Sequence, residues 1–409
     1  MIVSENRRNE HIYLIFTSLA HFANDGNSLL LTLLIVYYTA IPSVSIVFVG
    51  GAAIVYNVIS GLLSAPVGRW ADRIGRDTAL ISVGLILQGA AVVSFSLPFV
   101  ITRFWIAEIS AGAILLGFGQ SFYHPLGASV LKSVYGPLRS PAYMGINGAF
   151  GSIGRAATPA IFGVLALYVS IYAAFTYLAA SIVVFSILIY ASIGSFRRET
   201  FTQKQPSGPK TGIQAGDEKD SGSGSFLFLL TASVFLRAMM ISGVTLFMGE
   251  YIYIIIHSKA LTSEILTLSF IPPVIGQAYF GRVTSRIGGK NTTVLTGILS
   301  IIFFAAFLLF NNIIIEVVLY SLFNLVAFTG FPVLLGFVAQ QISGRKSGFA
   351  NSMVWGVGNT VGGATGIGVI TALVVYIPLY SAFWIMVVFG LASLPVLIFI
   401  RERTSSGHK

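Results

Sequence analysis

The sequence has no cysteine among its 409 residues and very few charged side chains. Without cysteine, neither a disulfide nor a thiolate metal site can form. Charged residues make up 9% of the chain, whereas a soluble protein has about 25%. So few charges cannot cover a water-facing surface, which excludes an ordinary soluble globular protein.

Sequence motifs for catalysis are missing as well. There is no phosphate-binding P-loop, so ATP does not drive the protein directly, and the pair Gly362-Gly363 lies inside an apolar run rather than after a strand. Neither a metal-ligand cluster nor the spacing of a serine nucleophile is present in the sequence. We therefore expect no enzyme, no cofactor and no bound metal.

Long apolar segments fill the chain instead. Hydrophobic residues make up 55% of it, and runs of about 20 apolar residues are long enough to span a bilayer. We predict an all-α membrane protein with twelve transmembrane helices. The predicted spans are 12–39, 44–68, 78–98, 102–131, 142–166, 170–194, 226–256, 262–281, 293–310, 313–343, 348–374 and 379–400.

The basic residues predict the orientation of these spans. The formal charge is +10, and twenty of the 24 Lys and Arg residues fall in the segments that share a side with the termini. Basic loops stay in the cytoplasm. We therefore expect a multi-pass protein of the plasma membrane with both termini cytoplasmic. Because membrane topology accounts for the basic charge, we expect no nucleic-acid partner.

The chain divides into two similar halves. Residues 1–197 are predicted to form an N-terminal six-helix bundle and residues 226–409 a C-terminal one, joined by a polar, flexible cytoplasmic linker over 198–225. The run Gly68-Arg-Trp-Ala-Asp-Arg-Ile-Gly-Arg76 returns as Gly281-Arg-Val-Thr-Ser-Arg-Ile-Gly-Gly289. A loop repeated between apolar spans indicates two pseudo-symmetric bundles, as in alternating-access transporters.

The repeated loop is a candidate gate. Its residues are Gly68, Asp72, Arg73, Gly75 and Arg76 in the first copy, and Gly281, Arg282, Arg286 and Gly288 in the second. The glycines permit close approach of helices, and Asp72 can accept hydrogen bonds from a helix N-terminus or a basic group of the other half. Such contacts would form in one conformation and break in the other. The alternative is that these charges only anchor a cytoplasmic loop.

Ionisable residues inside the predicted spans are candidate functional residues, because their burial in a membrane is costly. Asp25 and His21 lie one helical turn apart in the first span. We predict Asp25 as the proton carrier, assisted by His21, whose charge changes near neutral pH. The alternative is a permanent pair of Asp25 with His21 or Arg155 that only stabilises the bundle.

Other polar residues of the spans are candidates for the substrate cavity. We assign to it Asn24, His124, Arg155, Arg237 and Glu250. Arg237 has no acidic residue within a helical turn, so it either lines the cavity, where arginine binds carboxylate or phosphate well, or pairs with Glu250 or Asp25. Aromatic residues such as Phe331 and Trp355 are further candidates for the cavity lining.

These features together resemble the major facilitator superfamily over essentially the whole chain. The first copy of the repeated loop looks like the signature motif of that family, although the second copy has Ser285 in place of Asp72. Three stretches resemble the fosmidomycin-resistance-type exporters, namely His21-Phe-Ala-Asn-Asp25, Gly119-Gln-Ser-Phe-Tyr-His-Pro125 and Gly151-Ser-Ile-Gly154. That subgroup usually has an acidic residue after His-Pro, where this chain has Leu126.

The resemblance implies a function. It implies a secondary active transporter that binds a small molecule between the two bundles and exposes it to each side in turn. Resemblance to the exporters favours proton-coupled antiport of a drug or metabolite, with the substrate, protons and the lipid bilayer as the partners of a monomer. The alternative is a proton-coupled importer of a small organic anion that uses Arg155 and Arg237.

Overall fold

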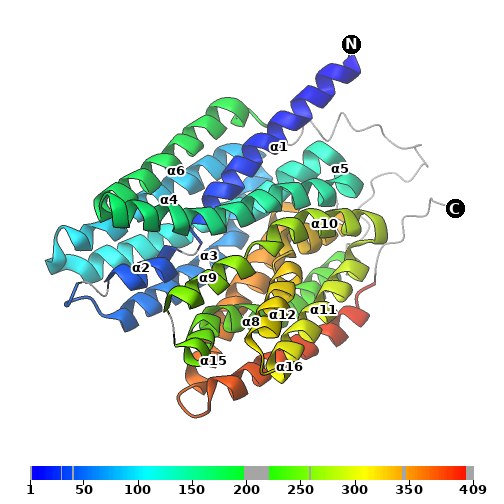
Figure 1. Cartoon of the computed structure of the whole chain (residues 1–409). Helices are drawn as coiled ribbons and strands as arrows, with labels where there is room; N and C mark the ends of the chain where they lie inside the picture. The colour runs from blue at the N-terminus through cyan, green and yellow to red at the C-terminus, as the bar shows by residue number, and fades with distance from the viewer. Residues whose placement is uncertain are drawn as a thin grey trace.

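The computed structural model describes residues 2–28, 30–38, 41–197, 221–257, 259–342 and 347–401, and these are almost entirely helical. Figure 1 shows two groups of long helices lying side by side. Helix α1 begins and α16 ends at the same end of the molecule, which we call the terminus end. Apolar sequence over whole spans produces helices because a helix satisfies every backbone hydrogen bond within itself.

The N-terminal group comprises the elements up to residue 193. They are α1 (Ile2–Gly26), α2 (Leu30–Tyr38), α3 (Ile46–Ile74), α4 (Asp77–Ser96), the short 3₁₀ turns η1 (Leu97–Phe99) and η2 (Thr102–Phe104), α5 (Trp105–Tyr168) and α6 (Ile171–Ile193). Helix α5 covers two predicted spans. Within it, Gly136 has φ 75° and ψ 167°, so two helices meet there at a residue whose backbone only glycine adopts readily.

The C-terminal group follows the same plan with more interruptions. Its elements are α8 (Ser221–Ile256), α9 (Lys259–Ser269), α10 (Pro272–Ile287), α11 (Gly289–Leu309), α12 (Ile313–Ala327), η3 (Phe331–Leu335), α13 (Gly336–Gln341), α14 (Ser347–Ser352), η5 (Met353–Val361), α15 (Gly362–Leu373) and α16 (Leu379–Ile398). Elements η3 and η5 are π-helical. Most of the predicted linker lies outside the described residues, and α8 already begins at Ser221.

The helices account for all twelve predicted spans. Within the described residues, eight helical segments are long and apolar enough to cross a membrane. One of them, Thr102–Tyr168, makes two crossings through the kink at Gly136. The remaining spans are each built from shorter elements, namely α1 with α2, α9 with α10, and α14 with η5 and α15. The expectation of an all-helical membrane protein is confirmed.

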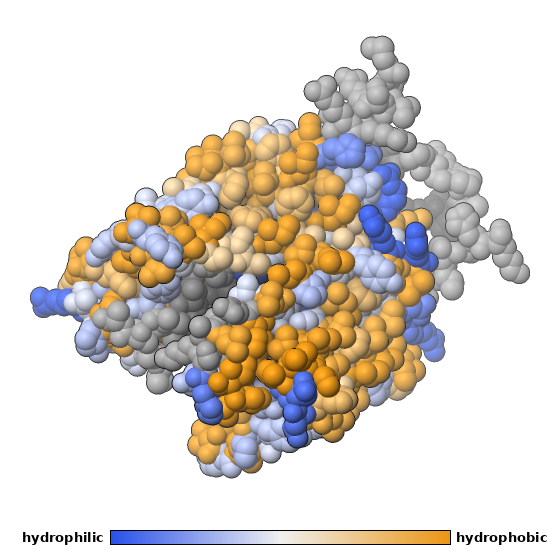
Figure 2. All heavy atoms as spheres, viewed as in Figure 1, coloured by the Kyte–Doolittle hydropathy of each residue, from blue (hydrophilic) through white to orange (hydrophobic). Residues whose placement is uncertain are grey.

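The surface is consistent with a lipid environment. Large apolar side chains are exposed on many helices, for example Leu167 at 76% and Ile275 at 66%. Figure 2 shows hydrophobic residues over most of the visible face, with many hydrophilic residues at the terminus end and a few towards the opposite end. In water such a surface would drive aggregation, whereas in a bilayer it is matched by lipid tails.

The two halves share an apolar core only towards the terminus end. One buried cluster contains residues of both halves, among them Met144, Leu230 and Phe337. Each of the other clusters lies within one half. One surrounds Phe95 in the N-terminal half, and a large and a small one surround Phe304 and Phe280 in the C-terminal half. The halves are therefore packed together at the terminus end and have separate cores elsewhere.

The contacts between α3 and the C-terminal half also become fewer with distance from the terminus end. A Cβ added at Gly61 would lie 2.7 Å from the carbonyl oxygen of Gly356 in η5, so the halves touch there. At Gly50 and Gly51 of α3, and at Gly368 of α15, an added Cβ would have no atom of the described residues within 4 Å. The end of α3 that lies away from the termini is thus not packed against a neighbouring helix at these positions.

Candidate functional site

Asp25 lies in the last turn of α1, beside a break in the first span. The sequence predicts one continuous helix over 12–39, but α1 ends at Gly26 and α2 begins at Leu30. Side chains support the break. The Asn27 amide donates to the Ala23 carbonyl at 3.0 Å, and the Tyr56 hydroxyl donates to the Ser28 carbonyl at 2.6 Å. Interrupted membrane helices that place polar groups at mid-bilayer are typical of transporter binding sites.

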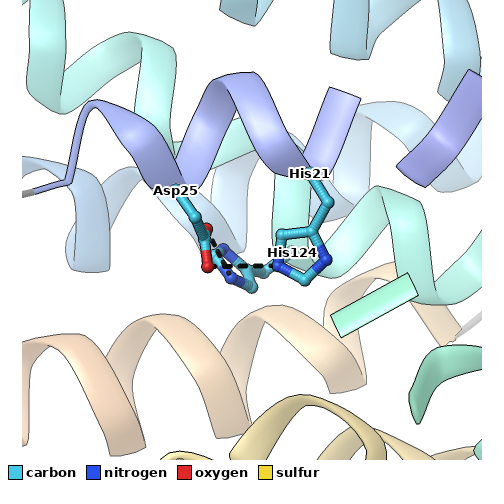
Figure 3. A group of neighbouring side chains, drawn as sticks. All are labelled: His21, Asp25 and His124. Atoms are coloured by element: carbon cyan, nitrogen blue, oxygen red, sulfur yellow. Dashed lines mark ion pairs between the residues drawn. The ribbon is translucent and has the colours of Figure 1, made fainter. Parts of the chain in front are cut away.

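The Asp25 carboxylate is surrounded by four polar side chains. His21 Nε2 lies 3.2 Å from Oδ2, and His124 Nε2 lies 3.3 Å from Oδ1. The Asn24 amide donates to Oδ1 at 3.1 Å, and Arg155 donates from NH1 to Oδ2. Figure 3 shows His21 and Asp25 on the same helix, with His124 approaching from α5. The structure thus joins the two predicted proton-coupling residues with three of the predicted cavity residues.

The cluster is buried, and a glycine makes room for it. Asp25 and His21 are each 1% exposed. A Cβ added at Gly151 of α5 would lie 2.5 Å from His21 Cδ2 and 2.8 Å from Asp25 Oδ2. Only a residue without a side chain allows α5 to approach α1 this closely.

Three of these residues have the separation of metal ligands, which the sequence spacing did not reveal. The nearest ligand atoms of His21, Asp25 and His124 all lie within 4.8 Å of one another. Two imidazoles and a carboxylate suit several divalent cations. However, the Arg155 guanidinium already contacts Oδ2 of Asp25, and a divalent cation at this point would face it directly. The donor set therefore fits a proton better than a metal ion.

Hydrogen bonds orient the His21 ring. Its Nδ1 lies 2.7 Å from the amide oxygen of Asn147. The amide nitrogen of Asn147 donates to the hydroxyls of Thr17 and Ser18 at 3.2 and 3.3 Å, which directs the oxygen towards His21. An amide oxygen only accepts, so Nδ1 carries the hydrogen and the neutral ring presents a lone pair at Nε2. That lone pair faces the Asp25 carboxylate, and the contact becomes attractive when a proton lies between the two groups.

A second layer of amides supports Asn24. The Gln88 amide donates to its side-chain oxygen at 2.8 Å, and the Gln120 amide donates to its backbone carbonyl at 2.7 Å. Gln120 belongs to the stretch that resembles the exporters, whereas nothing in the sequence singled out Gln88 or Asn147. Buried amides are ordinary in membrane helices, and only their convergence in space identifies these two.

Aromatic residues of the C-terminal half cover the cluster. The Trp355 indole stacks on His124 with ring centroids 4.1 Å apart, and Phe331 meets His21 at 4.7 Å. The Arg155 guanidinium lies 5.6 Å from the centroid of the Phe328 ring. Phe331 and Trp355 come from the π-helical segments η3 and η5, and such segments are frequent at functional sites. The polar site of one half is therefore in contact with the other half.

The other two predicted cavity residues lie apart from this cluster. Arg237 of α8 is 5% exposed and donates to the Thr296 hydroxyl at 3.1 Å and to the Val326 carbonyl at 3.3 Å. Its partners are thus neutral groups of its own half, and not the carboxylates of Glu250 or Asp25 that the sequence suggested. Glu250 is exposed near the end of α8.

The first copy of the repeated loop links the two halves. Asp72 of α3 accepts hydrogen bonds from the backbone amides of Gly348 and Phe349, both at 2.9 Å, at the start of α14. Gly68 approaches the same helix so closely that an added Cβ would lie 2.5 Å from the Gly348 carbonyl oxygen. Gly75, with φ 67°, ends α3. A carboxylate at a helix N-terminus is a favourable electrostatic contact.

The basic residues of this copy contribute less. The Arg69 guanidinium lies over the Phe349 ring at 5.5 Å. Arg73 and Arg76 are exposed on the surface. The geometry therefore assigns the contact between the halves to the carboxylate and the glycines.

The second copy makes a similar contact without the acidic residue. A Cβ added at Gly281 of α10 would lie 2.6 Å from the Pro141 carbonyl oxygen in α5. By this contact Pro141 corresponds to Gly348, but proline has no amide hydrogen to donate. Ser285 stands where the first copy has Asp72, so the carboxylate is absent, and the Ser285 hydroxyl donates within its own helix to the Gly281 carbonyl at 3.3 Å. Gly288, with φ 86°, ends α10, and Arg282 and Arg286 are exposed.

Replacement of Gly151 by alanine tests the packing of the cluster. We expect Gly151→Ala to cost about 1–3 kcal/mol of stability, because the new methyl group overlaps His21 and Asp25. Thermal unfolding in detergent measures this loss. The matched control is Gly163→Ala in the same helix, where the nearest atom to the added Cβ is the Tyr37 hydroxyl at 3.6 Å. Equal melting temperatures for the two variants would contradict the packing argument.

Comparisons with known proteins agree with this architecture. Residues 15–248 and 227–409 match the model of the Major Facilitator Superfamily. No curated protein sequence matches at a significant level. Among solved structures, the human organic anion transporter MFSD10 (TETRAN) has 17% identity and a TM-score of 0.71, with 96% of this chain and 99% of that chain covered.

Two further structures have the same fold. The proton:xylose symporter XylE has 13% identity and a TM-score of 0.76, covering 97% of each chain. A bacterial homologue of the iron transporter ferroportin, in an outward-facing state, has 14% identity and a TM-score of 0.69, covering 95% of this chain and 98% of that one. At such identities the likeness establishes the fold alone. With its two pseudo-symmetric bundles and a family match over nearly its full length, the chain belongs to the major facilitator superfamily.

Proposed function

We propose that this secondary transporter is coupled to protons, and that Asp25 with His21 forms the proton-binding site. The observation that carries the proposal is the orientation of His21, whose hydrogen-bonded Nδ1 leaves the Nε2 lone pair 3.2 Å from the Asp25 carboxylate. A bound proton turns this contact into a hydrogen bond, whereas its loss leaves two electron-rich groups opposed. Because a proton between His21 and Asp25 is favourable, this site can bind a proton on one side of the membrane and release it on the other.

Arg155 links the protonation of Asp25 to the binding of an anion. It pairs with Asp25 and also donates to the Ser152 hydroxyl at 2.9 Å, so it remains in place while the proton comes and goes. Protonation of Asp25 weakens its attraction for Arg155 and frees the guanidinium for another anion. The cluster also touches Phe328, Phe331 and Trp355 of the other half, so a change in its charge acts on an interface between moving bodies.

The packing of the halves supports an outward-facing conformation. The shared apolar core and the Asp72 contacts lie at the terminus end, which the basic residues predict to be cytoplasmic. Lys132 also donates to the Ile342 carbonyl across this interface. We infer that transport requires these contacts to break while the opposite ends of the halves close, as alternating access demands.

For the direction of transport we propose proton-driven export of a small molecule or drug. The support is the likeness of the His21–Asp25, Gly119–Pro125 and Gly151–Gly154 stretches to the fosmidomycin-resistance-type exporters. The proposed setting is the plasma membrane, with the monomer as the working unit. A thermal-shift screen of anionic and cationic small molecules is the first step towards the substrate.

Indole fluorescence tests proton binding without a known substrate. The chain has 4 Trp, and replacing Trp70, Trp105 and Trp384 by Phe leaves only Trp355, which stacks on His124. His124 also contacts the Asp25 carboxylate, so a proton taken up there changes the charge next to the indole, and we expect the Trp355 emission to change on acidification with a defined midpoint. A variant that keeps only Trp384, whose neighbouring ring is Tyr380, is expected not to respond. Emission from Trp355 that is independent of pH would remove the support for a protonatable cluster.

Import of a small organic anion together with protons is the second candidate. The observation that favours it is Arg155, a cation stacked on Phe328 and paired with a carboxylate that a substrate carboxylate could replace. Proteoliposomes with imposed pH gradients of each sign separate the two candidates. Antiport moves the substrate against the proton flux, whereas symport moves it in the direction of the proton flux.

A further inference from the structure

The tenth span, Ile313–Gln341, is interrupted next to the Asp25 cluster. Helix α12 ends at Ala327, and the π-helical segment η3 begins at Phe331. A break of this kind exposes backbone carbonyls that need donors from elsewhere, because no water is available in the bilayer core. The donors here are side chains of the same half.

Three side chains hold the backbone at this break. Arg237 donates from NH2 to the Val326 carbonyl at 3.3 Å, and the Thr329 hydroxyl donates to the same oxygen at 2.7 Å. Gln277 of α10 donates to the Phe328 carbonyl at 2.6 Å. These contacts also explain how a buried arginine is tolerated with no carboxylate partner among the described residues, since carbonyl oxygens at the end of α12 provide partial negative charge.

The rings that flank the break are those that touch the proton-binding cluster. Phe328 lies against the Arg155 guanidinium, and Phe331 lies against His21. One short segment is therefore held by the C-terminal half on its backbone side and contacts the N-terminal half with its side chains.

Gln277 is also in contact with the N-terminal half. A Cβ added at Gly148 of α5 would lie 2.5 Å from Gln277 Oε1. When the halves rock against each other, the α10–α5 contact and the Gln277–Phe328 hydrogen bond must move together or separate. Gln277 thus joins the interface between the halves to the break.

We propose that Arg237 and Gln277 are positioning residues that hold the break of the tenth span, and that the break relays the charge state of the Asp25 cluster to the C-terminal half. This inference rests on the proposed proton-coupled function. In it Arg237 serves coupling through the backbone of α12 rather than by binding substrate. The Arg155 guanidinium contacts the Phe328 ring and the Asp25 carboxylate at the same time, so a shift of the ring changes how the guanidinium lies against Asp25.

The single-Trp355 protein tests the relay with protons as the only ligand. In Gln277→Ala, Phe328 loses its anchor, Arg155 is held more completely by Asp25, and the proton affinity of the cluster falls. We expect the midpoint of the fluorescence titration to move by up to about one pH unit towards acid, a tenfold change in apparent proton affinity. Phe328→Leu is expected to move it by a similar amount, and the double variant no further, because both changes interrupt one pathway.

Gln340→Ala is the matched control. Gln340 of α13 is also a glutamine of the C-terminal half that donates to a backbone carbonyl, but that carbonyl is of Thr284 in α10, at 3.1 Å, and not of the break. Its removal is expected to lower the melting temperature without moving the midpoint. Arg237→Lys, which retains the charge, is expected to move the midpoint less than Arg237→Gln, with melting curves identifying any variant that does not fold.

The outcomes separate this inference from the proposed function. If the parent protein titrates but Gln277→Ala leaves the midpoint in place, or moves it no more than Gln340→Ala does, the relay is wrong and the proton site stands. Additive shifts in the Gln277→Ala, Phe328→Leu double variant would also overturn the relay. If the parent protein itself does not titrate, the proposed function fails first.

Discussion

Asp25→Asn is expected to suppress most of the transport driven by a pH gradient while leaving substrate exchange at equal pH intact. Asparagine preserves the size of the side chain and its hydrogen bonds to Asn24 and His124, but it can neither take up nor release a proton. We expect the pH-driven rate to fall on the order of 100-fold, since coupling of this kind is a free energy shared between two ligands. Flux of a compound found in the thermal-shift screen, measured in proteoliposomes, provides both rates.

The control for this variant is Glu108→Gln, which neutralises a carboxyl of α5 outside the cluster. It should retain pH-driven transport. If Asp25 is only a static partner of Arg155, pH-driven transport survives in Asp25→Asn and the loss appears in stability instead. In that case the double variant Asp25→Asn, Arg155→Gln recovers the melting temperature, because it removes the unpaired buried cation as well.

Asp72→Asn is expected to open the terminus end of the interface. The carboxylate accepts hydrogen bonds from two backbone amides of α14, whereas an asparagine side chain lacks the charge and has a single acceptor oxygen. Because the chain has no cysteine, a single Ser129→Cys reports on this interface without background. Ser129 is 0% exposed and faces the Ser347 hydroxyl at 3.3 Å.

We expect labelling of that cysteine by a maleimide to rise about tenfold in the Asp72→Asn background, as for the loss of one to two charge-assisted hydrogen bonds. Ser285→Ala, at the corresponding position of the second copy, is the control and is expected to have no effect, because the Ser285 hydroxyl is uncharged and donates within its own helix to the Gly281 carbonyl. Equal labelling in the two backgrounds would mean that Asp72 only anchors the loop.

The sequence marked Arg237 as a functional residue but did not predict its partners. A lone arginine in an apolar span indicates function, and the sequence suggested a cavity or a carboxylate partner. The structure places it against Thr296 and the Val326 carbonyl instead. The need for those donors arises from a helix break after Ala327, and the local sequence around Gly330-Phe331-Pro332 does not reveal which distant side chain satisfies it.

The residues of the Asp25 cluster were predicted one by one, but their arrangement was not. Asp25, His21, Asn24, His124 and Arg155 were each selected because ionisable or polar groups within spans are costly. Their meeting at one carboxylate required the close approach of α1 and α5 at Gly151. Asn147, which orients His21, carries no signal of its own in the sequence.

The sequence by itself determined the properties that depend on one-dimensional patterns. Apolar length defines spans, basic residues predict orientation, and the repeated loop with Asp72 reveals the duplication, because bilayer thickness and backbone hydrogen bonding act on each segment separately. Only the tertiary structure decided the breaks at Asn27 and Phe328, the donors that support them, and the placing of Trp355 and Phe331 over the cluster. These depend on which helices approach each other, and that is set by side-chain packing between segments far apart in the chain.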